Sequence, residues 1–276
     1  MPRPRRSVFR FALAVLSAPM CFVILAVFAR DLLAQELPAS LTPVETGQVV
    51  EIVDGDTIVL ADGRQVRLVG LQAPKLALGR SGFVDWPLAE ESQAFLEDLA
   101  LNRSVALAFG GLPEDRHGRL LAHLVRDDGV WLQGAILAAG MARVYSFADN
   151  RTAVADMLAL EQTARATEQG IWALSHYAIR AATEPLEEAV DSFQVIEGRV
   201  LDAAEVRGRY FLNFGEDYRT DFTVTVSPSD ARAFSDPQSD LLGLEGQQIR
   251  VRGWVGFRNG PQIEADHPEQ IEIIGP

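Results

Sequence analysis

One stretch of the chain, Val53–Lys75, restricts the possible folds more than any other. It reads VDGDTIVLADGRQVRLVGLQAPK, and the Asp62-Gly63 pair near its centre is a strong signal for a tight hairpin turn. Apolar and β-branched residues flank this turn, as in paired strands. Asp54, Asp56 and Arg67 are charged residues placed among these apolar positions. The stretch therefore predicts a β-hairpin that carries a polar site.

Further strands and helices follow the hairpin in a regular order. Strand patterns, rich in β-branched or alternating apolar residues, cover residues 49–59, 65–71, 104–109 and 119–125. Apolar residues at helical spacing predict helices at 88–101, 131–140 and 152–169. This order favours a β-barrel-based α+β fold for residues 47–180, in which helices pack on a small barrel.

The C-terminal part of the chain has a different pattern. Residues 181–192 hold four acidic residues and no basic one, which indicates an acidic linker. Residues 193–276 read as all-β, with candidate strands at 194–201, 209–214, 222–226, 248–255, 261–264 and 270–274. Such short strands favour a second small barrel of OB type, and a β-sandwich would give a similar pattern.

Aromatic residues are numerous in this all-β region. They are Tyr210, Phe211, Phe214, Tyr218, Phe222, Trp254 and Phe257. We expect them mainly in the core, and the alternative is a set of stacking platforms for nucleic-acid bases. Arg250, Arg252 and Arg258 flank Trp254 and would form a basic stripe if they shared a face. The region has 14 acidic residues against 8 arginines, which weighs against nucleic acid.

The first 34 residues read as a targeting segment. Four arginines lie within the first ten residues, and residues 11–29 form an apolar run without charge. This run belongs either to a cleaved signal peptide or to an uncleaved membrane anchor, and residues 35–46 follow as a spacer. In both cases the positive-inside rule predicts an extracytoplasmic body, periplasmic or secreted, or anchored to the inner membrane.

The charge of the body restricts its partners. The formal net charge is −13, of which the first 34 residues contribute +4 and the remainder −17. A body this acidic repels a phosphate backbone at long range, so it would not bind nucleic acid non-specifically. A local basic cleft stays open as a binding site.

Asp56 and Arg67 lie on neighbouring strands of the predicted hairpin. A structural ion pair on the barrel surface would explain these two residues alone. Arg119, which follows the tight turn at residues 115–118, adds a second arginine. Two arginines near a carboxylate suit a phosphate group, because guanidinium binds phosphate oxygens in a bidentate fork and a carboxylate holds hard cations such as Ca²⁺.

Four motifs in this order resemble the staphylococcal nuclease (thermonuclease) family. They are Val53–Thr57, Val66–Pro74, Asp115–Arg119 and Gly170–Trp172, and the resemblance covers roughly residues 47–172. It implies a five-stranded OB-type barrel with three helices and Ca²⁺-dependent hydrolysis of DNA and RNA.

Position by position, the resemblance also assigns roles. Asp56 matches the main calcium carboxylate, supported by Asp54 and Thr57, and the carbonyl of Ala73 matches a backbone ligand. Arg67 and Arg119 match the two arginines that hold the scissile phosphate and stabilise the charge that develops on it.

Two positions depart from the family pattern of Asp-x-Pro-Glu. Gln72 replaces the second calcium carboxylate, so the affinity for Ca²⁺ should fall. Lys75 replaces the glutamate at the general-base position, and an ordinary ammonium cannot accept a proton at neutral pH. Lys75 is either a solvated loop residue or a cation that replaces the charge of the metal beside Asp56. If it is desolvated beside Arg67 and Arg119, its pKa falls and it could lose its proton, which would rescue the base.

Three functions follow from these residues. The first is a thermonuclease-family protein that keeps its phosphate-binding arginines, has a degenerate calcium and base set, and acts mainly by binding nucleic acid or another phosphate-containing ligand. The second is an active metal-dependent phosphodiesterase whose site is rearranged, with Asp85, Glu90 or Glu91 supplying a carboxylate. The third is a protein-interaction module of the cell envelope, with both barrels as docking surfaces. The acidic body and the lack of a broad basic face favour it over a role in binding DNA.

Overall fold

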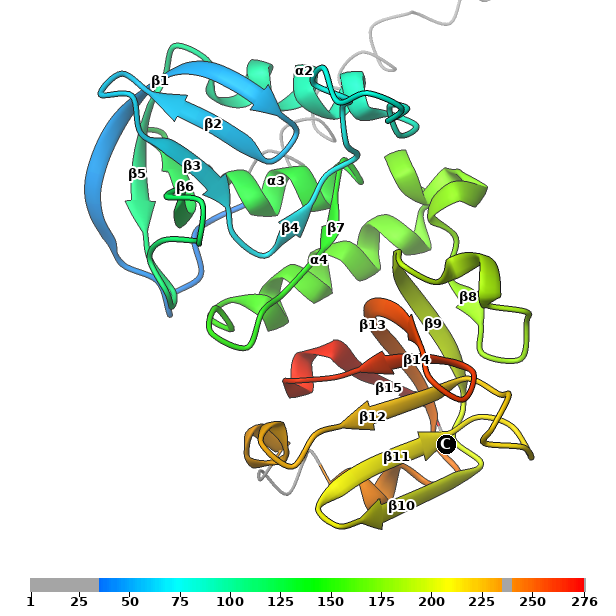
Figure 1. The fold of residues 1–276 in the computed structure, drawn as a ribbon. Coiled ribbons are helices and arrows are strands. Elements are labelled where there is room, and N and C mark those ends of the chain that lie inside the picture. The colour runs from blue at the N-terminus through cyan, green and yellow to red at the C-terminus, as the bar shows by residue number, and fades with distance from the viewer. Residues whose placement is uncertain (1–34, 235–239, 276) are drawn as a thin grey trace, which may run out of the picture.

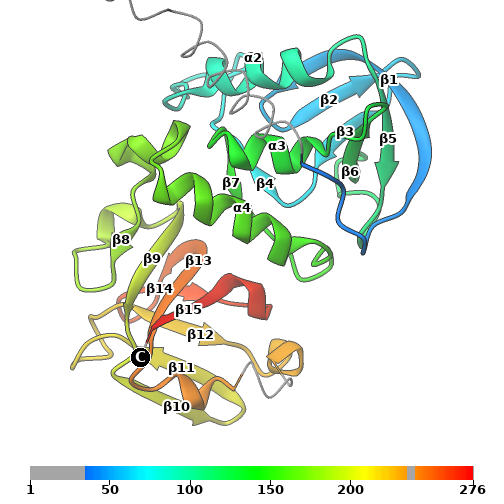
Figure 2. The ribbon, with the colours of Figure 1, turned by 180° about the vertical axis from the view of Figure 1, so that it is seen from behind.

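The computed structural model describes residues 35–234 and 240–275 of the chain (Figure 1). The predicted targeting segment lies outside the described residues. In the part that is described, no helix is long and apolar enough to cross a membrane. The buried apolar residues form two clusters, one within residues 41–157 and one within residues 182–265. The chain thus has two units, and Figures 1 and 2 show them side by side.

The strands of the first unit follow one another around a closed path. They are β1 (Pro43–Asp54), β2 (Thr57–Leu60), β3 (Gln65–Leu68), β5 (Ser104–Ala108) and β6 (Leu120–Arg126). The order is β1-β2-β3-β6-β5, and β5 pairs in turn with β1. The predicted hairpin is β2 and β3, with Thr57 opposite Arg67. Its turn needs glycine at position 63, where φ is 86°.

Three helices cover this arrangement, as the sequence predicts. They are α2 (Ala89–Ala100), α3 (Leu132–Ala138) and α4 (Val154–Ala166). Each turns apolar residues such as Leu96, Ile136 and Met157 into the first core. A two-stranded sheet of β4 (Leu71–Gln72) and β7 (Arg143–Val144) lies beside the barrel, with Leu71 opposite Val144 and Gln72 opposite Arg143. The 3₁₀ helices η1 (Gly170–Ala173) and η2 (Ser175–Tyr177) follow α4.

The second unit is an all-β region, as expected. Its strands are β8 (Arg180–Ala181), β9 (Phe193–Arg199), β10 (Asp202–Val206), β11 (Arg209–Asn213), β12 (Thr223–Val226), β13 (Gln248–Phe257), β14 (Pro261–Glu264) and β15 (Ile271–Gly275). They pair in the order β10-β11-β12-β14-β13-β9-β8, and β15 pairs with β13. Short 3₁₀ helices are η3 (Glu187–Ala189), η4 (Asp230–Phe234), η6 (Leu242–Leu244) and η7 (Pro268–Gln270). The OB-type barrel stays a prediction for this region.

The predicted spacer and linker both contribute to the cores. Leu41, within residues 35–46, is buried in the first core, and β1 begins two residues later. Leu186 and Ala189, within residues 181–192, are buried in the second core. The four acidic residues of that segment therefore lie on a structured connection, because the apolar residues between them pack inward.

A buried ion network joins the two units. Arg252 of β13 is 1% exposed and donates to both carboxylate oxygens of Glu161 on α4, at 3.1 and 2.9 Å. It also donates to Glu272 of β15 at 2.5 Å, and Arg165 of α4 contacts the same Glu272 at 3.1 Å. Although burial opposes its charge, Glu161 and Glu272 raise the pKa of Arg252. The expected basic stripe is therefore wrong for Arg252, which is inside the contact between the units.

Candidate functional site

Asp56 is the buried centre of the predicted site. Its side chain is fully buried at the turn between β1 and β2, and its two oxygens accept hydrogen bonds from Ala73 N at 2.8 Å and Thr57 Oγ1 at 3.3 Å. Asp54 supports the turn by accepting a 3.1 Å hydrogen bond from Asp56 N. Gly55 is required here, because a Cβ atom would lie 2.1 Å from the Ser92 hydroxyl. The turn is thus pressed against α2.

Arg67 reaches Asp56 from the neighbouring strand, as the sequence predicts. Its guanidinium contacts the Asp56 carboxylate and donates to the Leu71 carbonyl at 2.6 Å. Burial lowers the pKa of Arg67 to about 10, and Arg119 acts in the same direction while Asp54 opposes it. Arg67 remains a cation at neutral pH, so Asp56 has one permanent positive partner.

Lys75 supplies the second positive partner of Asp56. Its ammonium lies 2.7 Å from Oδ1 and 2.6 Å from Oδ2 of Asp56, and 3.2 Å from Oδ2 of Asp54. The side chain is 22% exposed. Burial lowers the pKa of Lys75 to about 7, and Arg67 acts in the same direction. Of the two predicted placements, the structure has the cation on Asp56.

The side chain of Gln72 is occupied by a different partner. Its amide oxygen accepts hydrogen bonds from Arg143 Nε at 2.8 Å and Arg143 Nη2 at 2.6 Å. Arg143 also donates to the Phe193 carbonyl of the second unit at 3.0 Å and lies over the Phe193 ring. Gln72 thus positions an arginine that joins the two units. Sequence reasoning missed Arg143, because nothing around it in the sequence pairs it with Gln72.

Arg67 and Arg119 line one cavity of about 580 Å³. Arg119 is held by Asp115, to which its Nε donates at 2.8 Å, and its side chain stays 32% exposed. Asp115 also fixes the turn by accepting hydrogen bonds from the backbone of His117 and Arg119. The two predicted arginines are therefore brought to the same cavity from β3 and from the turn before β6.

An aromatic pair forms another wall of this cavity. Tyr145 and Phe147 line it, with ring centroids 4.7 Å apart in an edge-to-face arrangement. The second unit supports the pair: Trp254 Nε1 donates to the Tyr145 hydroxyl at 2.7 Å, and the Phe193 ring lies 4.7 Å from that of Tyr145. The sequence signal for this wall was the Tyr-Ser-Phe run after Val144, which had no motif around it.

Known proteins share this domain. The sequence profile described as staphylococcal nuclease homologue matches residues 65–174. A protein of Escherichia coli named ParB is 33% identical over 147 residues, which cover 47% of this chain and 73% of the relative. The chain belongs to the staphylococcal nuclease family. An uncharacterized endonuclease of Escherichia coli O157:H7 is 28% identical over 129 residues, which cover 46% of this chain and 76% of that nuclease relative.

In this structure the predicted Ca²⁺ ligands of this staphylococcal nuclease homologue face cationic side chains. Both oxygens of Asp56 face Lys75, and the amide oxygen of Gln72 faces Arg143. Within residues 35–234 and 240–275, no three or more His, Cys, Asp or Glu residues gather in a way that could hold a metal ion. Ala73 turns its N–H toward Asp56, and the role of its carbonyl as a ligand stays a prediction.

The three carboxylates that could replace the missing one at the site contact another group or face solvent. Asp85 accepts a 2.5 Å hydrogen bond from Ala77 N and so closes its own loop. Glu90 and Glu91 are exposed on the first turn of α2. The site therefore combines two arginines and one lysine with three aspartates, Asp54, Asp56 and Asp115, and it lacks an evident carboxylate base.

Proposed function

We propose that this protein is an extracytoplasmic member of the staphylococcal nuclease family that binds nucleic acid, or another phosphate-containing ligand, and has little or no Ca²⁺-dependent nuclease activity. One observation carries the proposal: the Lys75 ammonium lies 2.6 and 2.7 Å from the two oxygens of Asp56. In the family pattern those oxygens serve the metal, and position 75 carries the general base.

The cavity beside this ion pair supports phosphate binding. Arg67 is engaged by Asp56 and Leu71, whereas Arg119 is one-third exposed and has Asp115 as its ionic partner. Guanidinium groups on two sides of a cavity suit a phosphate diester, because each can donate two hydrogen bonds to its oxygens. Tyr145 and Phe147 offer ring surfaces for a base on the same cavity wall.

The acid–base chemistry of hydrolysis has no carboxylate to carry it out at this site. A general base contributes about 10²- to 10⁴-fold to such reactions. Lys75 stands at the base position. Burial lowers its pKa to about 7, whereas its contacts with Asp54 and Asp56 stabilise the protonated form, which cannot accept a proton. The same contacts neutralise the carboxylates that would attract a divalent cation. Binding without efficient turnover is the function that this arrangement supports best.

An active phosphodiesterase is the second candidate. It is favoured by the retained Arg67 and Arg119 and by the relatives of Escherichia coli that are named endonuclease. A loop movement that brought Asp85 to Asp56 would supply the missing carboxylate. An interaction module of the envelope is the third candidate, and a pull-down that recovers a discrete protein partner from an envelope fraction would favour it.

Localisation belongs to the same proposal. The arginine-rich start and the apolar run over residues 11–29 support export, or anchoring in the inner membrane. Fractionation of cells that express the full chain with a C-terminal tag tests this. Recovery of the tag from the cytosol would contradict it.

The decisive experiment measures cleavage and binding together. Denatured DNA is incubated with the full chain in Ca²⁺ or in a chelator, and binding of a fluorescent single-stranded DNA is followed by anisotropy in the chelator. We expect no metal-dependent cleavage, and a binding affinity that Arg119→Gln lowers about tenfold or more, because a hydrogen bond to a charged group is lost. Arg103→Gln, an exposed arginine in the same unit, is the matched control. Robust cleavage that requires Ca²⁺ would refute the proposal.

A further inference from the structure

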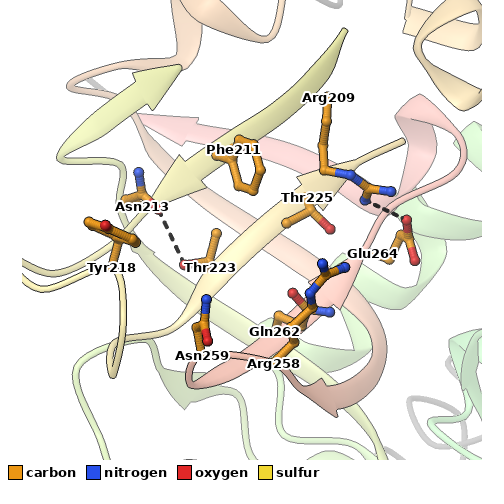
Figure 3. Close-up of a pocket in the computed structure, with 10 residues that line it drawn as sticks. All are labelled: Arg209, Phe211, Asn213, Tyr218, Thr223, Thr225, Arg258, Asn259, Gln262 and Glu264. Carbon is orange, nitrogen blue, oxygen red and sulfur yellow. Dashed lines mark hydrogen bonds and ion pairs between the residues drawn. The ribbon is translucent and has the colours of Figure 1, made fainter. Parts of the chain in front are cut away.

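A second polar groove lies on the outer face of the C-terminal sheet, away from the Asp56 site. Two rows of side chains cross strands β11, β12 and β14 there (Figure 3). One row is Phe211, Thr225 and Glu264; the other is Asn213, Thr223 and Gln262. The residues between them in sequence, such as Leu212 and Val224, face the second core. The rows therefore form the surface opposite that core.

The groove owes its depth to the small residues of its central strand. Thr223 and Thr225 form the floor, and larger side chains stand on both flanking strands (Figure 3). Tyr218 lies at one end, and Arg258 and Asn259 come from the connection between β13 and β14. The cavity has a volume of about 300 Å³, which is at the lower end of the range for small-molecule sites.

Hydrogen-bonding groups in this groove lack partners. Thr225 is 3% exposed, and its hydroxyl oxygen has no hydrogen-bond partner among the described residues. A buried hydroxyl without a partner costs free energy, so such a group usually marks a bound water or ligand. Asn259, Gln262 and Arg258 line the same groove, and no hydrogen bond of their side chains occurs in the described part of the chain.

Among the described residues, the charges of the groove leave one cation, Arg258, without an ionic partner. Arg209 is paired with Glu264 at 2.7 Å, so these two residues cancel. Asp202 accepts a hydrogen bond from Asn213, and Asp217 lies 3.9 Å from Arg219, which in turn covers the Tyr218 ring. The Arg258 guanidinium is exposed and has no ionic partner in the described residues. The groove thus joins aromatic surface, neutral donors and acceptors, and a single positive charge.

We propose that this groove binds one nucleotide unit of a single-stranded nucleic acid. The base stacks on Phe211 or Tyr218, because aromatic rings accept any base on their faces. Arg258 binds one phosphate, and the Asn259 and Gln262 amides with the Thr225 hydroxyl bind the polar edges of the base or sugar. The site lies on a different unit from Arg67 and Arg119, so it stands independently of the function proposed for them.

The acidic surroundings restrict how much of a strand the groove can hold. A groove that followed several phosphates would need several cations, and in the part of the chain that the structure describes this one offers Arg258 alone as a cation without an ionic partner. For a single strand, the logarithm of affinity falls with the logarithm of salt concentration with a slope of about −0.7 per neutralised phosphate. We therefore expect a slope of about −0.7, which is far shallower than that of a basic binding channel.

Binding by the full chain tests the proposal. The probe is 5′-fluorescein hexathymidylate, followed by anisotropy in a chelator, with the Arg119→Gln background used to reduce binding at the first cavity. Arg258→Gln should lower the affinity about tenfold, and Thr225→Val about three- to tenfold. Arg207→Gln, an exposed arginine in the turn between β10 and β11, removes the same charge and should change little. Thr225→Val should not lower the unfolding midpoint, since the hydroxyl has no hydrogen-bond partner among the described residues and its burial costs free energy.

Each result tests one of the two proposed binding sites. Loss of affinity with Arg258→Gln and Thr225→Val supports the groove, even if Arg119→Gln alone has no effect and the function proposed for the first cavity fails. Equal affinities for the Arg258→Gln and Arg207→Gln proteins would overturn the groove as a nucleotide site. So would displacement of the probe by trigalacturonate but not by thymidine 5′-monophosphate, which would indicate an acidic sugar.

Discussion

Replacing Lys75 by alanine should make the stability of the protein depend on Ca²⁺. In the native site, Asp54 and Asp56 face Arg67 and Lys75, so two negative charges meet two positive ones. Removal of Lys75 leaves one uncompensated negative charge beside the fully buried Asp56. It also opens the place that the ammonium occupies between two carboxylates, where a hard cation could enter.

The expected magnitude follows from burial. Breaking a buried ion pair by removing one partner typically costs about 3–5 kcal/mol. Lys75 is 22% exposed and Arg67 stays on Asp56, so we expect a loss of about 1–3 kcal/mol. A loss of about 2 kcal/mol would lower the melting temperature by about 4–8 °C in a protein of this size.

Added Ca²⁺ should recover part of that loss. With a dissociation constant of about 1 mM, as in weak calcium sites, 10 mM Ca²⁺ stabilises the variant by about 1.4 kcal/mol. Differential scanning fluorimetry with Ca²⁺ or a chelator measures both effects. Lys75→Arg keeps a cation at this position and serves as the control, which should respond to Ca²⁺ as little as the native protein. If Lys75→Ala melts at the same temperature with and without Ca²⁺, the lysine does not replace a metal ion.

Two further predictions concern the rest of the structure. Arg252→Met should lower the free energy of unfolding, measured by denaturant titration, by about 3–5 kcal/mol, because Glu161 keeps a fully buried charge. The double variant Arg252→Met with Glu161→Leu should recover most of that loss. Equal stability of the single variant and the native protein would contradict the buried network. His123 is neutral in the fold, since burial lowers its pKa from 6.5 to about 4. The stability that the fold gains with a neutral His123 is complete above pH 6.5 and is lost as the pH falls through 4. The free energy of unfolding should therefore decrease by about 3 kcal/mol over this range. His123→Gln should remove this decrease, the exposed His117→Gln should not, and identical pH profiles for the two variants would refute the assignment.

The sequence predicts the first unit well because its signals are local. The Asp62-Gly63 turn sets the register that places Thr57 opposite Arg67, and this register brings Arg67 to Asp56. The three helices follow from apolar spacing alone. The placement of Lys75 was one of two alternatives, and only the path of the loop around Pro74 decides between them. Spacing cannot give that path, because proline fixes its own φ and not the direction of the next side chain.

Contacts between the units could not be predicted in this way. Arg143 reaches Gln72 and Phe193 across 71 and 50 residues of sequence, and Trp254 reaches Tyr145 across 109. His267 has no patterned neighbour in the sequence, yet it is buried and bonded to Ser146 at 2.7 Å. Such pairs depend on how two separately folded cores meet, and no periodicity within either unit contains that information.

These contacts give the two departures from the nuclease pattern different physical reasons. Lys75 acts at the site itself, where its ammonium supplies Asp56 with the positive charge that a metal ion supplies in the family pattern. Gln72 acts outside the site, where its amide oxygen accepts hydrogen bonds from Arg143, which also donates to the Phe193 carbonyl. An aspartate at position 72 would gain a charged partner in Arg143, so the new carboxylate would be neutralised before it could serve a metal. Restoring both family residues therefore need not restore the calcium site, because the contact with the second unit has taken over one of its positions.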